Sequence, residues 1–147
     1  MHISQEGIDL VKKFEGGRLT AYQCAAGVWT CGYGSTRGVQ QGDVWSQEKA
    51  EIMLVDELEE YGAYVEDLVT VPLNQQQYDA LTSWTFNLGP SNLKSSTLLQ
   101  VLNKGDYDGV PQQIKRWNKV NGQVNDGLIR RRDAEALLFE GKHWEHI

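Results

Sequence analysis

"FEGGRLTAYQCAAGVWTCGYGST" occupies residues 14–36 and joins two kinds of sequence pattern, a helical period before it and a glycine-rich segment within it. Eight residues separate Glu15 from Cys24, and five more separate Cys24 from Thr30. The stretch therefore brings an acid, a thiol and a hydroxyl together in sequence, at the point where a helix gives way to short strands and tight turns.

The residues before this stretch predict an amphipathic helix. Ser4 is a suitable N-cap, and apolar residues recur on one face as far as Phe14. Gly16 should end the helix and leave Glu15 in its last turn, where the helix dipole disfavours a negative charge. An acid in that position indicates a chemical role, with a solvated helix-end glutamate as the alternative.

The rest of the chain predicts a small β part followed by helices. Recurring glycines among apolar residues favour short strands over 18–45. Apolar residues then keep a helical period from 46 to 68, which predicts a helix of about 30 Å. Shorter helices should follow, the first of them opened by a capping box at Asn74. Asn121-Gly122 and Asp126-Gly127 predict turns.

Composition excludes several classes of protein. The chain has 147 residues, of which 40% are hydrophobic and 23% charged, and this favours a folded domain. The net charge of −6 argues against nucleic acid as the main partner, because phosphate binding needs clustered cations. The basic runs are therefore interpreted as solvated helix faces: Lys12-Lys13, Lys115-Arg116 and Arg130-Arg131-Arg132. No apolar run suggests a membrane span, and no spacing suggests a metal or cofactor.

Each residue of the opening stretch has a chemical interpretation and a structural one. A partly desolvated Glu15 would keep its proton and serve as a general acid. Cys24 could be a buried hydrophobe, could pair with Cys31, or could be a peptidase nucleophile if a terminal histidine folded against it. Thr30 alone is most simply a β-branched strand residue.

The spacing of Glu15, Cys24 and Thr30 resembles the catalytic signature of the phage-type lysozymes, the endolysins of tailed bacteriophages. Flanking segments resemble the same family: "FEGGRLTAY" (14–22), "GVWTCGYG" (27–34), "LNQQQYDALTSWTFNLG" (73–89) and "RRRDAEALLFEG" (130–141). The resemblance extends over nearly the whole chain.

This resemblance implies an α+β, lysozyme-like fold in which a small β-rich lobe and a larger helical lobe are joined by a long helix, with a cleft between them. We therefore expect one domain over 1–147. Its β-rich lobe should cover about 15–45, its linking helix about 46–68 and its helical lobe about 73–147.

The resemblance also implies hydrolysis of the bond between N-acetylmuramic acid and N-acetylglucosamine in peptidoglycan, which lyses the host cell. Glu15 would be the general acid. Cys24, at a position that usually holds a carboxylate, would face the other side of the sugar, and Thr30 would orient the attacking water. Three positions depart from the family pattern, namely Gly17, Cys31 and Ser35, the last of which is often histidine.

We expect a monomer without a cofactor or metal, without nucleic acid and without stable membrane insertion. Its first residues read as a helix and lack the pattern of a signal peptide, so we expect it in the host cytoplasm. It would reach the wall after a separate protein permeabilises the membrane. The alternatives are a lytic transglycosylase on the same fold, a non-catalytic peptidoglycan-binding module and a cysteine peptidase.

Overall fold

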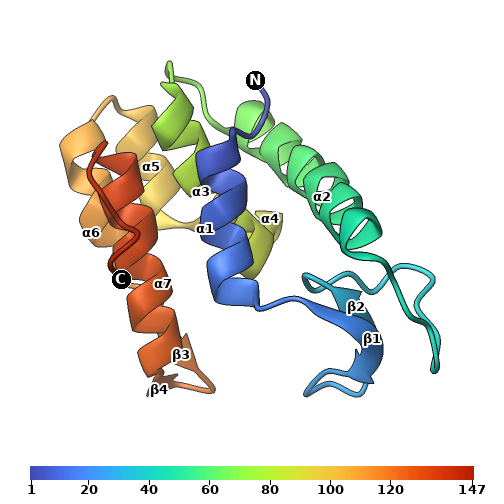
Figure 1. Ribbon diagram of the computed structural model, residues 1–147. Coiled ribbons are helices and arrows are strands. Elements are labelled where there is room, and N and C mark those ends of the chain that lie inside the picture. Colours follow the sequence, from blue (N-terminus) through green and yellow to red (C-terminus); the bar gives the residue numbers. More distant parts are fainter.

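Helices make up most of the structure, a computed structural model that describes residues 1–147, and the strands are confined to two hairpins (Figure 1). In chain order the elements are α1 (Gln5–Glu15), β1 (Arg18–Gln23), β2 (Trp29–Gly32), α2 (Gln47–Leu68), α3 (Gln75–Leu88), α4 (Pro90–Ser95), α5 (Thr97–Asn103), the 3-10 turn η1 (Tyr107–Gly109), α6 (Val110–Lys115), β3 (Lys119–Val120), β4 (Gln123–Val124) and α7 (Asp126–Phe139).

The helix ends follow local capping chemistry. The Ser4 side chain accepts a hydrogen bond from the Gly7 N–H at the start of α1, and Gly16 ends that helix with a φ of 61°. Ser46 caps α2, and Asn74 forms a capping box with Gln77 at α3. The helix starts predicted at Ser4, at residue 46 and at Asn74 are confirmed.

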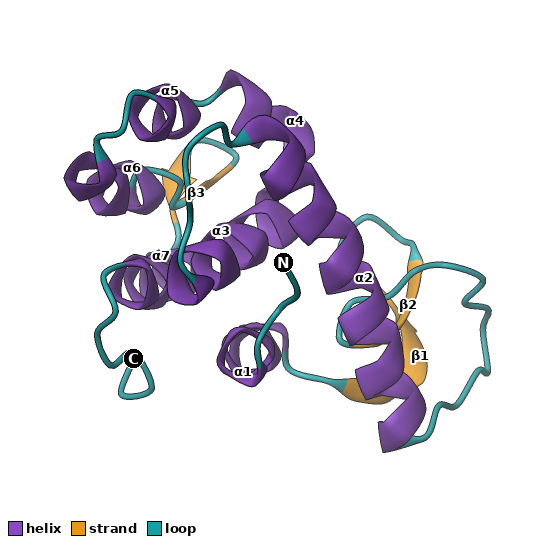
Figure 2. Ribbon diagram, turned by 90° about the horizontal axis from the view of Figure 1, so that it is seen from above, coloured by secondary structure: helices purple, strands orange, loops and turns teal.

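The largest core lies among the helices that follow α2. It has 17 buried residues, among them Trp84, Leu98 and Ile114, which lose all contact with water. In this core α3 lies between α7 on one side and α2 on the other (Figure 2). Burying that much apolar surface is the main source of stability in a domain of this size, and it makes these helices a rigid support for whatever they carry.

The β part is small and lies beside the N-terminal half of α2 (Figures 1 and 2). Strands β1 and β2 are antiparallel, and Tyr22 pairs with Thr30. The cluster of buried apolar residues beneath them has three members, Cys31, Trp45 and Ala50. The hairpin therefore depends on α2 for most of its packing.

Two predictions from sequence need correction, and one helix was missed. Short strands joined by tight turns were expected over 18–45, but the strands end at Gly32 and the rest of the segment holds turns and isolated bridges. The predicted turn at Asp126-Gly127 is wrong, because Asn125 accepts a hydrogen bond from the Leu128 N–H and starts α7 there. Helix α4 was not predicted, although Pro90 occupies its first turn, a position that suits proline.

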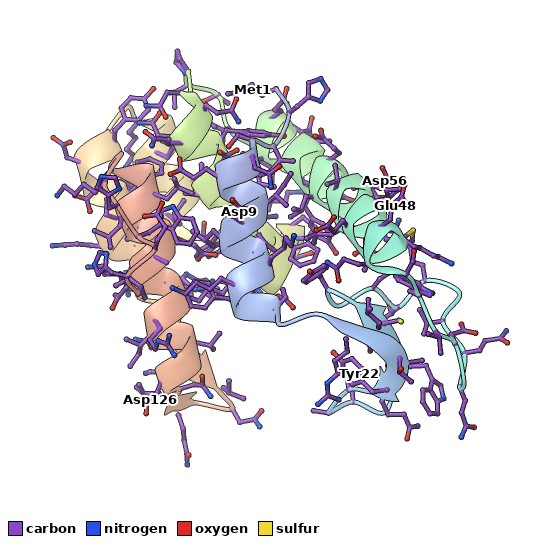
Figure 3. All side chains as sticks on the ribbon, in the orientation of Figure 1. Met1, Asp9, Tyr22, Glu48, Asp56 and Asp126 are labelled. Atoms are coloured by element: carbon purple, nitrogen blue, oxygen red, sulfur yellow. The ribbon has the colours of Figure 1, made fainter.

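No helix is both long and apolar enough to cross a membrane. The division of the chain into a β-rich lobe, a linking helix and a helical lobe stays a prediction. Figure 3 shows labelled residues of the two parts, Tyr22 on β1 and Asp126 on α7, on opposite sides of the lower end of α1, the end at which Glu15 lies.

Candidate active site

Glu15 lies at the end of α1 on the wall of a cavity of about 260 Å³. The cavity forms where α1, α2, α3 and the loop after β2 meet, and its lining includes Arg37, Glu57 and Asn87. The Glu15 side chain is 21% exposed, and its Oε1 accepts a hydrogen bond of 2.6 Å from Arg131 Nη1. One carboxyl oxygen is thus fixed by a cation from α7, 116 residues further along the chain.

The partner of Glu15 is itself held inside the helical core. Arg131 is 3% exposed, and its Nε lies 3.3 Å from Oε2 of Glu135, one turn later on α7. The same Oε2 accepts a 2.6 Å hydrogen bond from the Ser83 hydroxyl of α3. A buried guanidinium is tolerated only when carboxylates and hydrogen bonds surround it, so the orientation of Arg131 is set by α3 and α7 together.

A second buried arginine extends this network back to the cavity. Arg132 is fully buried, its Nε lies 3.2 Å from Oε1 of Glu135, and its Nη2 donates a hydrogen bond to Oδ1 of Asn87. Burial lowers the pKa of Arg132 from its ordinary value, because removal from water disfavours the charged form. The chain of contacts Glu15–Arg131–Glu135–Arg132–Asn87 begins and ends at residues that line the cavity.

This network overturns one interpretation of the sequence. The run Arg130-Arg131-Arg132 was expected to be a solvated helix face, yet its second and third members are buried and bind carboxylates. The available signal was Glu135, which follows them by four and three residues on the same helix. The contact of Arg131 with Glu15 also explains why an acid can sit at the unfavourable end of α1.

The other oxygen of Glu15 faces the loop that follows β2. Gly34 has a φ of 97°, and a Cβ added to it would lie 3.2 Å from Oε2 of Glu15. Glycine is needed there for two reasons, since other residues rarely adopt that backbone conformation and a side chain would crowd the carboxyl group.

A second carboxyl group lines the same cavity. Glu57 of α2 is only 8% exposed, and it accepts a 2.8 Å hydrogen bond from the Ser35 hydroxyl. Burial raises the pKa of Glu57, and the hydrogen bond from Ser35 partly opposes that rise. Sequence reasoning missed Glu57, because a glutamate in an acidic helix gives no sign that it faces inward.

Cys24 and Thr30 lie on the β1–β2 hairpin, where the structure brings them close to each other. The pKa of Cys24 is lowered mainly by the backbone N–H groups of Val28 and Ala26 in the turn, with a smaller contribution from the Thr30 hydroxyl. Thr30 is buried, and its hydroxyl donates to the Val28 carbonyl over 2.9 Å. Neither residue is among those that line the Glu15 cavity.

The two cysteines are both free, so the local bridge left open by the sequence is absent from this structure. The hairpin register explains this. The Cys24 N–H bonds to the Val28 carbonyl, whereas Cys31 lies three residues further along β2 and is buried. Three residues of a strand span about 10 Å, beyond the Cα separation of about 4.4–6.8 Å that a disulfide requires.

A family model described as phage lysozyme matches residues 12–135. The chain belongs to the phage lysozyme family. It is 48% identical over 144 residues to the endolysin of Acyrthosiphon pisum secondary endosymbiont phage 1, a match that covers 95% of this chain and 99% of that protein. It is 44% identical over 142 residues to the endolysin of Bacillus phage B103, but there the match covers 95% of this chain and only 54% of the relative.

Solved structures of the family have the same fold. The muramidase domain of SpmX from Asticaccaulis excentricus superposes with a TM-score of 0.89 at 38% identity, covering 95% of this chain and 98% of that one. A point mutant of the P22 lysozyme superposes with a TM-score of 0.87 at 39% identity, covering 95% of this chain and 99% of that one. The lysozyme-like α+β fold expected from the sequence is therefore confirmed.

Proposed function

We propose that this chain is an endolysin that hydrolyses the glycosidic bond between N-acetylmuramic acid and N-acetylglucosamine in peptidoglycan and so lyses the host cell. Its membership of the phage lysozyme family supports a glycoside hydrolase. The observation that carries the assignment of the acid is the place of Glu15, at the wall of a cavity with one oxygen held by Arg131.

Glu15 acts as the general acid in this proposal. Cleavage of a glycosidic bond needs a proton on the leaving oxygen while the sugar carbon develops oxocarbenium character. Arg131 holds Oε1 of Glu15 and leaves Oε2 on the side of Gly34 to carry that proton. Because Arg131 is buried and fixed by Glu135, the acid is already oriented before substrate binds.

Cys24 and Thr30 act on the opposite side of the sugar in this proposal. Backbone N–H groups stabilise the thiolate of Cys24, which favours a form able to accept a proton from an attacking water. The Thr30 hydroxyl donates a hydrogen bond to the Val28 carbonyl of the hairpin and lies beside the sulfur of Cys24. Hydrolysis then adds the water's hydroxyl to the sugar carbon and leaves the proton from Glu15 on the departing oxygen.

The site of action and the mode of assembly follow as further proposals. The protein acts as a monomer on the peptidoglycan wall and reaches it from the host cytoplasm after another protein permeabilises the membrane. With a net charge of −6, it has no long-range attraction to an anionic wall, so binding depends on contacts within the cavity.

Product analysis of digested murein sacculi tests this function. Hydrolysis predicts new reducing ends on N-acetylmuramic acid and muropeptide masses that include one water. Anhydro sugars would instead identify a lytic transglycosylase, and new amino termini a peptidase. Binding to sacculi without a fall in turbidity would identify a binding module, and each of these three outcomes would reject the proposal.

A further inference from the structure

We infer that Glu57 is a positioning residue for the general acid, acting through Ser35. This inference rests on the proposed function of Glu15. Glu57 would touch neither the scissile bond nor the attacking water. Its carboxylate would fix the loop that forms the wall beside the free oxygen of Glu15.

The first step of the argument is the buried contact itself. Glu57 lies on α2 and is 8% exposed, Ser35 is 3% exposed, and the Ser35 hydroxyl donates to Oε1 of Glu57 over 2.8 Å. A hydrogen bond to a charged acceptor in a buried place is stronger than one at the surface. Loss of either partner would leave the other without its bond.

The second step links Ser35 to the acid. The Ser35 N–H donates to the Cys31 carbonyl over 3.0 Å, and the Cys31 N–H donates to the Ser35 carbonyl over 2.9 Å, so 31–35 forms a closed turn. Gly34, the residue before Ser35, approaches Oε2 of Glu15 so closely that an added Cβ would lie 3.2 Å away. A shift of Ser35 would therefore move the surface against which the proton-bearing oxygen rests.

The third step compares this contact with the other side-chain bonds between the same loop and α2. Tyr33 accepts a hydrogen bond from Gln47, and Arg37 forms an ion pair with Glu60. Both of these are at the surface, and exposed ion pairs contribute little to stability. Of the three, only Ser35–Glu57 is buried, and Ser35 directly follows Gly34 in the chain.

The charges around Glu57 fit this role. Arg37 of the loop attracts its carboxylate, while Asp56 and Glu60 of its own helix repel it. Glu15 lines the same cavity from α1. The alternative is a buried acid that merely satisfies its hydrogen bond, and it would leave the chemical step unaffected by substitutions that preserve folding.

The positioning role and the purely structural role of Glu57 can be separated by initial rates on soluble peptidoglycan strands, with thermal stability measured in parallel. We expect Ser35→Ala and Glu57→Ala each to lower kcat about tenfold, with KM changed less than about twofold, because misplacing a catalytic group affects the chemical step. The double variant should be no worse than Glu57→Ala alone, since both remove the same contact. Glu57→Gln should keep kcat within about twofold, because its amide oxygen still accepts from Ser35.

Gln47→Ala is the matched control, since it breaks the surface hydrogen bond from the same helix to Tyr33 of this loop and should leave kcat unchanged. The inference is overturned if Ser35→Ala keeps the wild-type kcat, if the two losses multiply in the double variant, or if Glu57→Gln loses as much as Glu57→Ala. Absence of new reducing ends with the wild-type protein would instead reject the proposed function.

Discussion

The helical core around α3 and the hairpin β1–β2 differ sharply in how they hold their functional side chains. The helical core contains 17 buried apolar residues, whereas the cluster under the hairpin contains three. Glu15 is fixed by a buried network of charges on the helical side. Cys24 is half-exposed in a turn, and its polar neighbours are mainly backbone N–H groups.

This contrast suggests a division of labour. The acid must stay in one orientation, so it is placed against rigid helices. The hairpin carries Cys24 and Thr30, which we propose act on the attacking water, and it depends on α2 and the loop at Ser35 for its position. The following predictions test this contrast.

Removing Glu135 should cause one of the largest losses of stability. Glu135→Ala would leave Arg131 and Arg132 buried without their shared carboxylate, at a cost of about 3–5 kcal/mol in the free energy of unfolding. Denaturant unfolding measures this, with Glu48→Ala, at an exposed position in the first turn of α2, as the control. Equal stabilities of the two variants would contradict the role given to the buried network.

Replacing one tryptophan in the helical core and one under the hairpin should show how differently the two regions are stabilised. Trp84→Ala in the helical core should lower the free energy of unfolding by about 3–5 kcal/mol. Trp45→Ala should lower it by less and should chiefly accelerate amide hydrogen exchange in 18–45. Uniform acceleration of exchange across the whole chain by Trp45→Ala would show that the hairpin does not open separately.

The two thiols should differ in reactivity and in their effect on lysis. Cys24 should react with iodoacetamide in the folded protein, and its lowered pKa should put the midpoint of the rate at a lower pH than in the denatured chain. Cys31 should react only after unfolding, because it is buried.

Cys24→Ser should also reduce lysis about a hundredfold, the lower range for loss of a proton-transfer group, and more than Cys31→Ser does. Equal losses in lysis would argue that neither thiol takes part in the reaction.

The smallest effect concerns the buried carboxyl group beside the acid. The pKa of Glu57 is raised above 4.5, so the folded state binds this proton more tightly than the unfolded chain. Its contribution to stability is therefore present below pH 4.5 and is lost as pH rises through the folded value. Glutamine does not ionise, so Glu57→Gln does not lose stability in this way as pH rises. The difference between Tm of the variant and Tm of the wild type should therefore increase between about pH 4 and pH 7.

The difference should be a few degrees at most, because 1 kcal/mol shifts Tm of a domain of this size by about 2–4 °C. Glu48→Gln, at an exposed position in the first turn of the same helix, should show no such trend. A Tm difference for Glu57→Gln that does not vary with pH would contradict the burial argument.

Local patterns predicted much of the fold. The caps at Ser4 and Asn74 and the helical period over 46–68 depend on neighbours a few residues away, and each prediction is confirmed. The hairpin at 119–124 was missed apart from its turn at Asn121-Gly122, because two-residue strands carry too little pattern to detect.

The residues of the candidate site were harder to predict from the sequence. Glu15 stands out because its place at a helix end is unfavourable, which a local rule can detect. Arg131 does not, because its contact with Glu15 joins residues 116 positions apart and its burial depends on how α3 packs against α7. The roles of Glu15, Cys24 and Thr30 in the reaction stay predictions.

The lytic activity of the Glu15→Gln variant tests the central claim most directly. Turbidity of a murein suspension should fall with wild-type protein and should fall at no more than about 1% of that rate with the variant, since loss of a general acid typically costs 10²–10⁴-fold. Tm should show that the variant is folded, because glutamine can still accept a hydrogen bond from Arg131. A folded variant that clears the suspension at the wild-type rate would contradict the account.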